Sequence, residues 1–236
     1  MRRELSEKEI LDTVRDIRHE APGIGAYKLY LMLKELYPDG MRGRDWFYGL
    51  MHESHLMLKL GKRRHTTSSN HPYRKYKNMI KGLTVNRINQ LWVADITYID
   101  TDEGVAYLHL LTDAFTHEII GWVLSDSLVA SNTVTALEMG ISHVSPLGFD
   151  GLIHHSDRGV QYCCNQYIDR LQAIKATISM TEDYKPTDNA IAERVNGIIK
   201  QEWLYRMKRP PDVVVARDLL GRIIGFYNNR RPQRSN

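Results

Sequence analysis

Residues 91–124 read LWVADITYIDTDEGVAYLHLLTDAFTHEIIGWVL, and this stretch decides the fold. It contains three runs rich in apolar, β-branched and aromatic residues, at 91–99, 105–111 and 118–124. Short polar segments at 102–104 and 116–117 separate these runs and have the composition of tight turns. Runs of this length, bounded by such turns, are typical of β-strands. The stretch therefore predicts an antiparallel meander of three strands.

The sequence after the meander alternates between helical and strand patterns. Apolar residues recur with helical spacing after residue 131, whereas short apolar runs with a strand pattern lie between the helical segments. The expected elements are a helix at 131–144, a strand at 152–155, a helix at 165–174, a strand at 176–180, and closing helices at 189–207 and 213–227. The order βββαβαβα predicts an α/β fold, in which helices pack on a mixed sheet.

The first 58 residues have helical patterns instead. Ser6 and Glu9 form the sequence signature of a capping box, and Pro22 and Pro38 interrupt the apolar periodicity that follows. A third helical segment is expected at about 44–58. Three short helices with tight breaks are typical of a helix-turn-helix module. A small helical bundle without a role in DNA binding has the same periodicity, so the pattern leaves both alternatives open.

The charge is distributed unevenly along the chain. The net charge is +8 over residues 1–90, −8 over 91–180 and +4 over 181–236. No acidic residue occurs between Glu53 and Asp95, a stretch that contains nine lysines and arginines. Basic arms around an acidic centre favour a polyanionic partner such as nucleic acid, although a solvated linker beside an ordinary acidic domain has the same composition. We expect a helix-turn-helix-like domain at 1–58, a basic linker at 59–89 and an α/β core with a closing C-terminal helix at 90–236.

Composition excludes several classes of protein. The 236 residues are 42% hydrophobic, and the mean hydropathy of −0.42 is ordinary for a folded chain. There is no run of about 18 apolar residues, so we expect no membrane-spanning segment and no membrane partner. The two cysteines, Cys163 and Cys164, are adjacent, which excludes a disulfide scaffold and fits a cytoplasmic protein.

Three carboxylates stand where strands and a helix bring functional residues together. Asp95 interrupts the first apolar strand, Asp157 directly follows the 152–155 strand, and Glu193 lies on a polar stripe of the 189–207 helix. Individually, each residue has an ordinary alternative: a structural aspartate, a turn residue or a solvated glutamate. Together they could bind hard divalent cations, which prefer oxygen ligands. Two such ions would support in-line phosphoryl displacement.

Several motifs in this sequence match one known family. They are QLWVADITYI (90–99), YL (107–108), DAF (113–115), GW (121–122), HHSDRGVQY (154–162), DNAIAE (188–193), YN (227–228) and RP (231–232). The interval between Asp157 and Glu193 contains 35 residues, the spacing typical of this group. The chain resembles the second-frame (orfB-type) product of insertion-sequence transposases, which have a retroviral-integrase-like DDE catalytic core.

The resemblance implies a ribonuclease-H-like core with Asp95, Asp157 and Glu193 as catalytic residues and metal ligands. The implied cofactor is Mg²⁺ as two ions, with Mn²⁺ as a substitute. The implied reaction is cleavage at the 3′ ends of the insertion sequence followed by strand transfer. The implied partner is DNA, both the terminal inverted repeats of the element and the target, bound by a homo-oligomer. A bacterial, cytoplasmic protein associated with the nucleoid when bound to DNA is expected.

Basic and polar residues near these features are expected to contact DNA. They are Arg42, Arg44, Lys62, Arg63, Arg64, Arg74, Lys75, Lys77, Arg158, Asn189, Arg194 and Lys200. Asp113 matches a family position, but we expect it to be structural, and Glu182 is expected to contribute little because its stretch departs from the family pattern. Two alternatives remain: a catalytically decayed DNA-binding remnant of the element, and a ribonuclease-H-type hydrolase without strand transfer.

Overall fold

The computed structural model describes residues 5–58, 72–144, 148–182 and 189–233. The chain divides into two compact units that do not follow chain order. Unit 1 contains residues 1–63, 198–208 and 220–236, and unit 2 contains residues 64–197 and 209–219. No helix within the described ranges is both long enough and apolar enough to cross a membrane.

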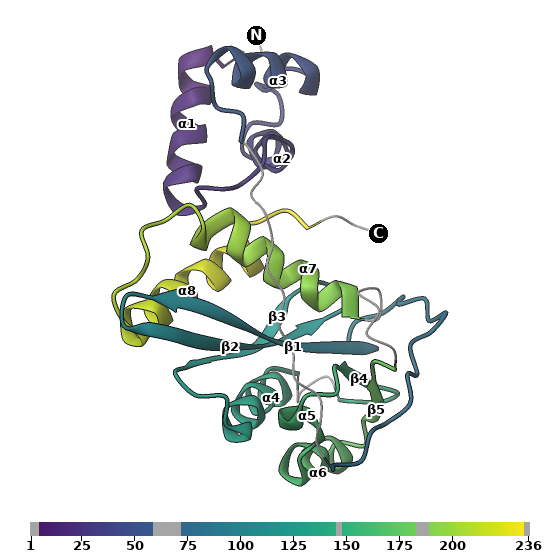
Figure 1. Cartoon of the computed structure of the whole chain (residues 1–236). Coiled ribbons are helices and arrows are strands. Elements are labelled where there is room, and N and C mark those ends of the chain that lie inside the picture. Colours follow the sequence, from purple (N-terminus) through teal and green to yellow (C-terminus); the bar gives the residue numbers. More distant parts are fainter. Residues whose placement is uncertain (1–4, 59–71, 145–147, 183–188, 234–236) are drawn as a thin grey trace. The chain divides into compact units, whose positions relative to one another are not determined.

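Unit 2 is built on a five-stranded mixed sheet (Figure 1). Its strands are β1 (Leu91–Thr101), β2 (Gly104–Asp113), β3 (Ile119–Ser125), β4 (Ile153–Ser156) and β5 (Thr177–Met180), in the spatial order β3-β2-β1-β4-β5. The first three strands form the expected antiparallel meander, while β4 pairs in parallel with both β1 and β5. The α/β fold class and the mixed sheet expected from the sequence are confirmed.

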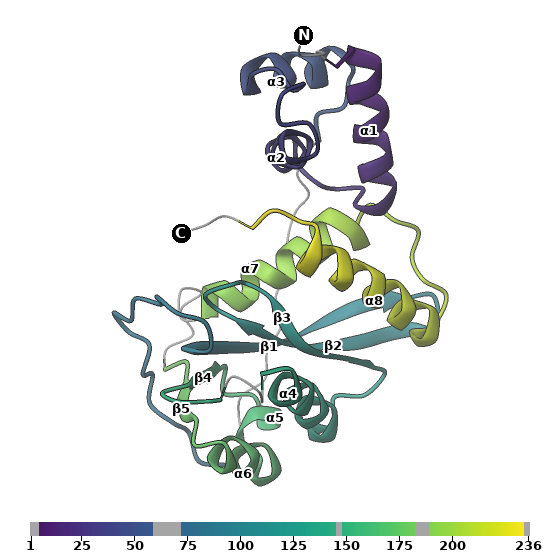
Figure 2. The same cartoon turned by 180° about the vertical axis from the view of Figure 1, so that it is seen from behind.

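One face of the sheet packs against α4 (Ala130–Val144), α5 (Val160–Cys163) and α6 (Asn165–Ala173), as Figures 1 and 2 show from opposite sides. Trp92 and Ala94 of β1 point into this core. At Gly121 the backbone of β3 approaches α4 so closely that a Cβ atom would lie 2.1 Å from the carbonyl oxygen of Ala136. The short helix α5 was not expected from the sequence, because four residues are too few to show helical periodicity.

The opposite face of the sheet packs against the first turns of α7 (Ala190–Ile199). Leu91 and Val93 of β1 form a small core there with Ala192 of α7. Because successive strand residues point to opposite faces, Asp95 lies on the same side as Leu91 and Val93. This alternation places the Asp95 carboxylate toward α7.

The N-terminal part of unit 1 contains α1 (Glu7–Glu20), α2 (Ala26–Leu36) and α3 (Arg44–Glu53). The capping box of Ser6 and Glu9 is present at the start of α1, as predicted. The third helix is shorter than the expected 44–58. It ends at Glu53 because His55 adopts a left-handed backbone conformation (φ 54°), which a right-handed helix does not accommodate.

The remainder of unit 1 comes from the C-terminal third of the chain. The expected continuous helix at 189–207 is wrong in its second half: α7 ends at Ile199, and a π-helical turn, η3 (Lys200–Leu204), follows. Within this turn the fully buried Trp203 donates a 2.8 Å hydrogen bond from its indole N–H to the carbonyl oxygen of Glu20. The final helix is α8 (Val213–Asn229), which begins in unit 2 and ends in unit 1.

Candidate active site

Asp95 lies in the middle of the central strand β1 and is half-buried. Burial raises the pKa of its carboxyl group from 3.8 to about 7, and the nearby negative charge of Asp157 acts in the same direction. Glu193 adds a smaller effect of the same sign. Asp157 and Glu193 are therefore both near enough to Asp95 for their negative charges to affect its pKa.

Two asparagines of the α7 segment bind β1 at this point. The Nδ2 of Asn196 donates a 2.6 Å hydrogen bond to the Oδ2 of Asp95, which favours the ionised carboxylate and lowers its pKa. The Nδ2 of Asn189 donates a 3.1 Å hydrogen bond to the carbonyl oxygen of Ala94. Both asparagines are buried, and together they hold the first turns of α7 over the central strand.

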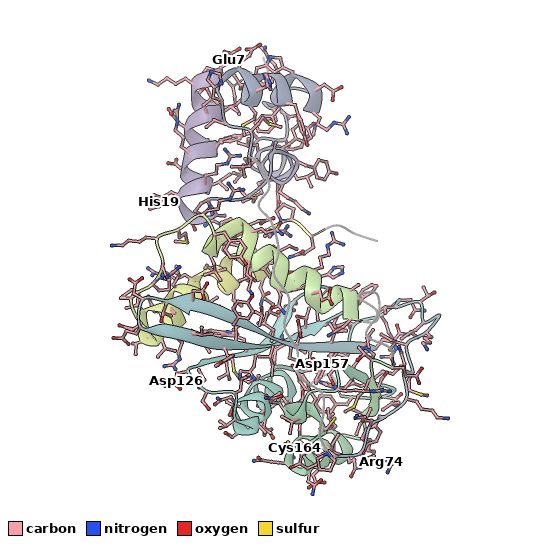
Figure 3. All side chains as sticks on the ribbon, viewed as in Figure 1. Glu7, His19, Arg74, Asp126, Asp157 and Cys164 are labelled. Atoms are coloured by element: carbon pink, nitrogen blue, oxygen red, sulfur yellow. The ribbon has the colours of Figure 1, made fainter. Side chains whose placement is uncertain are left out.

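Asp157 is the first residue after β4, where the strand ends beside β1 (Figure 3). Its Oδ1 accepts a 2.8 Å hydrogen bond from the backbone N–H of Gly159. This turn leads into α5, which contains the buried Tyr162. The pKa of Tyr162 is raised well above its usual value, first by burial and then by the charges of Asp95 and Asp157. Its hydroxyl has no hydrogen-bond partner among the described residues.

Glu193 is in the first turn of α7 and is half-buried. It therefore comes from a third element, separate from β1 and the turn after β4. Carboxylate oxygens are suitable ligands for hard divalent cations, so the chemistry of the donor set fits a magnesium site. Within the described residues, however, no three His, Cys, Asp or Glu side chains converge closely enough to enclose a metal ion. Mutual repulsion of the three carboxylates opposes such convergence.

The sequence-predicted DNA contacts fall in both units. Arg74, Lys75 and Lys77 are exposed in unit 2 before the sheet, and Arg194 is exposed on α7. Asn189 is buried, with its amide N–H group bonded to β1. Three of the predicted DNA contacts, Arg42, Arg44 and Lys200, belong to unit 1. Lys62, Arg63 and Arg64 lie outside the described residues.

Asp113 is a structural residue, as expected from the sequence. It is buried at the end of β2, and its carboxylate accepts hydrogen bonds from the backbone N–H groups of Asn89, Phe115 and Thr116 at 2.8, 2.9 and 2.8 Å. These bonds tie the entry of β1 to the turn between β2 and β3. All three bonds are between the side chain and the backbone, which accounts for a polar side chain in a buried position.

Two residues of the site were not among the sequence-predicted candidates. Asn196 belongs to the polar stripe of the predicted helix, and its spacing of three residues from Glu193 was the available signal. Tyr162 ends the motif HHSDRGVQY, but no periodicity in a four-residue helix indicates where its hydroxyl points. Only the folded chain relates Tyr162 to Asp95 and Asp157.

Two known protein families match overlapping parts of this chain. Residues 85–186 and 174–235 match two families that are both described as integrase core domains. The chain is 30% identical over 237 residues to the transposase for insertion sequence element IS904 of Lactococcus lactis, covering 95% of this chain and 89% of that protein. The chain belongs to the insertion-sequence transposase family. Another member of the transposase family, from element IS629 of Shigella sonnei, is 33% identical over 173 residues.

The transposase family includes longer proteins. The match to the IS629 transposase covers 72% of this chain but 56% of that protein, so the chain spans little more than half of its length. Among solved structures, the simian T-cell lymphotropic virus intasome contains a chain with a TM-score of 0.52 at 17% identity, covering 94% of this chain and 69% of that one. This likeness concerns the fold alone.

Proposed function

We propose that this chain cuts DNA at the ends of an insertion sequence and joins the freed 3′ ends to target DNA. Support comes above all from the placement of the three acids: Asp157 follows β4, which pairs with the strand of Asp95, and Glu193 lies on α7, whose Asn196 donates a hydrogen bond to Asp95. A strand, the turn after a second strand and a helix thus contribute acids to one place. In a chain of the transposase family, such a cluster is suited to phosphodiester chemistry.

The proposed metal ligands are Asp95, Asp157 and Glu193, with two Mg²⁺ ions as the cofactor and Mn²⁺ as a substitute. Bound divalent cations would activate the attacking oxygen and stabilise the leaving one. Other residues of this chain orient the proposed metal ligands. Asn196 orients the Asp95 carboxylate and favours its ionised form, while the Gly159 N–H group orients Asp157. Because the pKa of Asp95 is about 7, ligand binding requires this carboxyl group to release its proton near neutral pH.

The proposed division of labour follows the charge distribution. Residues 1–58 would bind the terminal inverted repeats, residues 59–89 would follow the phosphate backbone, and residues 90–236 would contain the chemistry. Because two DNA ends must be processed, we propose a homo-oligomer on DNA. The bacterial origin of the relatives favours action on DNA in a bacterial cytoplasm, in association with the nucleoid when the protein is bound.

The test is Glu193→Gln in the full chain, assayed on duplexes made from the terminal sequences that flank the gene. This change keeps the side-chain volume but removes the charge that would bind a cation. Cleavage and strand transfer should fall together by a factor of about 10³, because one site serves both steps. DNA affinity should change by no more than a few-fold. Glu103→Gln, in the exposed turn after β1, is the matched control and should leave both activities unchanged.

The assay separates the proposal from its alternatives. DNA binding by the parent chain without metal-dependent cleavage would identify a DNA-binding remnant. Cleavage without any joined product on a strand-resolved gel would identify a hydrolase. Near-parent rates in Glu193→Gln would show that the assignment of the three acids is wrong.

A further inference from the structure

A segment that precedes the sheet, residues 72–81, is attached to the edge strand β5 of unit 2. The backbone N–H of Met79 donates a 2.8 Å hydrogen bond to the Oγ of Ser179. The N–H of Met180 donates a 3.3 Å hydrogen bond to the carbonyl oxygen of Lys77. Since β5 is the last strand of the sheet, these bonds use backbone and side-chain groups at an edge that would otherwise face solvent.

Glu182, two residues after β5, binds this segment through both oxygens of its carboxylate. Its Oε1 accepts a 3.1 Å hydrogen bond from the backbone N–H of Asn78, and its Oε2 accepts one of 2.8 Å from the ammonium group of Lys81. These donors lower the pKa of the Glu182 carboxyl group, with Lys81 as the main cause. The backbone carbonyl oxygen of Glu182 accepts a 3.0 Å hydrogen bond from Arg158. One residue therefore connects the 72–81 segment to the residue that follows Asp157.

The attached segment is strongly basic. Arg74, Lys75, Lys77 and Lys81 are all exposed, and residues 72–81 contain no acid. Glu182 accepts hydrogen bonds from both Lys81 of the segment and Arg158 of the turn after β4. Attachment of the segment to β5 thus brings its last cation near the turn that contains Asp157 and Arg158.

The acid in this basic surface needs an explanation. A carboxylate among cations that bind phosphate would repel the phosphate, unless its charge is already engaged within the protein. Both carboxylate oxygens of Glu182 are engaged in this way. An exposed ion pair such as Lys81–Glu182 contributes little to stability. The hydrogen bond from the backbone N–H of Asn78 to Glu182, by contrast, fixes the position of the 72–81 segment.

We propose that Glu182 is a positioning residue that holds the 72–81 segment on β5, so that its cations form a phosphate-binding row leading to Asp157. The partner is the sugar-phosphate backbone of the DNA strand that enters the site, so this inference rests on the proposed function. In this proposal Glu182 supports DNA binding although it is an acid, whereas the sequence alone predicts that it contributes little.

Glu182→Ala in the full chain tests this proposal, because two explanations predict opposite signs. Removal of an acid from a basic surface should tighten DNA binding if only the net charge matters. Loss of the attachment should instead weaken it. We expect affinity for a fluorescent 30-base-pair duplex of arbitrary sequence to fall about 10-fold at 100 mM salt, with a plot of log K against log salt that is less steep by about two. Glu103→Ala is the control for charge alone and should bind as tightly as the parent or slightly more tightly.

Two further readouts distinguish positioning from general destabilisation. Amide hydrogen exchange at Asn78 and Met79 should be at least 10-fold faster in Glu182→Ala, with an unchanged melting temperature. Glu182→Gln keeps an acceptor for Asn78 but loses the ion pair with Lys81, so it should have an intermediate affinity.

The possible failures can be told apart. Equal or tighter DNA binding by Glu182→Ala, while the parent binds DNA, would overturn this inference and leave the proposed function intact. Unchanged exchange at Asn78 and Met79 would also overturn it. Failure of the parent chain to bind DNA would overturn both the phosphate-binding row and the proposed function.

Discussion

The side-chain amide of Asn196 donates a 2.6 Å hydrogen bond to the carboxylate of Asp95 from a position 101 residues away in the chain. A hydrogen bond to the charged form of an acid lowers its pKa, whereas burial and neighbouring carboxylates raise it. At Asp95 the opposing effects leave a pKa of about 7. The protonation state of this central acid near neutral pH therefore depends on a balance between burial, which raises its pKa, and hydrogen bonds such as that from Asn196, which lower it.

Replacement of Asn196 by leucine should raise the pKa of Asp95 further. Leucine keeps the approximate volume but donates no hydrogen bond, and a hydrogen bond to a charged group contributes about 1.5–3 kcal/mol. One pKa unit is about 1.4 kcal/mol, so the pKa of Asp95 in the metal-free chain should rise by about 1–2 units. NMR titration of the Asp95 carboxyl group without divalent cations measures this. Asn132→Leu on α4 should keep the parent titration curve. An unshifted curve in Asn196→Leu would contradict the role assigned to Asn196.

Divalent cations should stabilise the folded chain through the three acids. If Mn²⁺ binds with a dissociation constant near 1 mM, about 10 mM of the ion should stabilise by about 1.4 kcal/mol, which raises the melting temperature by about 3–5 °C. The rise should be less than half as large in Asp157→Asn, because one proposed ligand is lost. Asp126→Asn, an exposed substitution beyond β3, should show the full rise. An equal rise in all three proteins would place the cation elsewhere.

Asp113 should matter for stability rather than for chemistry. Asp113→Ala leaves the backbone N–H groups of Asn89, Phe115 and Thr116 without their acceptor in a partly buried turn. We expect the free energy of unfolding to fall by about 2–4 kcal/mol, as measured by urea titration. An unfolding midpoint equal to that of the parent would show that water replaces the carboxylate at no cost.

Gly121 should tolerate no side chain. A Cβ atom at this position would lie 2.1 Å from the carbonyl oxygen of Ala136, and backbone cannot move aside as a flexible side chain can. Gly121→Ala should therefore destabilise unit 2 by about 2 kcal/mol or more. Gly49→Ala provides the contrast, since that helical glycine has open space and alanine favours a helix by about 0.5–1 kcal/mol. Similar thermal unfolding of the two variants would contradict the close packing of β3 on α4.

Stability at acidic pH should depend on His154. This buried residue accepts or donates a 2.8 Å hydrogen bond with the hydroxyl of Tyr167, and burial, followed by the neighbouring His155, lowers its pKa from 6.5 to about 3. Because the folded-state pKa is the lower one, this stability is present above pH 6.5 and is lost as the pH falls toward 3. The paired variant His154→Leu with Tyr167→Phe should lack this dependence.

The measurement is the free energy of unfolding of both proteins at pH 7.5 and pH 4.5. The parent should lose about 2–3 kcal/mol more than the paired variant over this interval. Parallel losses would mean that His154 takes up its proton equally well in the folded and unfolded chains.

Local patterns in the sequence predicted the elements of this protein well. The apolar run at 91–99 predicted a strand, and the structure places Trp92 and Ala94 on one face of β1 and Leu91 and Val93 on the other. The capping box of Ser6 was equally predictable. These features depend on neighbours within a few residues, so their physical causes are present in the sequence itself.

Tertiary structure decided the remaining features. The end of α3 depends on the left-handed conformation of His55, and the end of α7 on a π-helical turn whose Trp203 is buried against Glu20. The bond between Asn196 and Asp95 and the attachment of residues 72–81 by Glu182 join groups about one hundred residues apart. Side-chain periodicity shows which face of an element a residue occupies. It does not show which residue from a distant part of the chain will contact that face, because such contacts depend on how the whole chain packs.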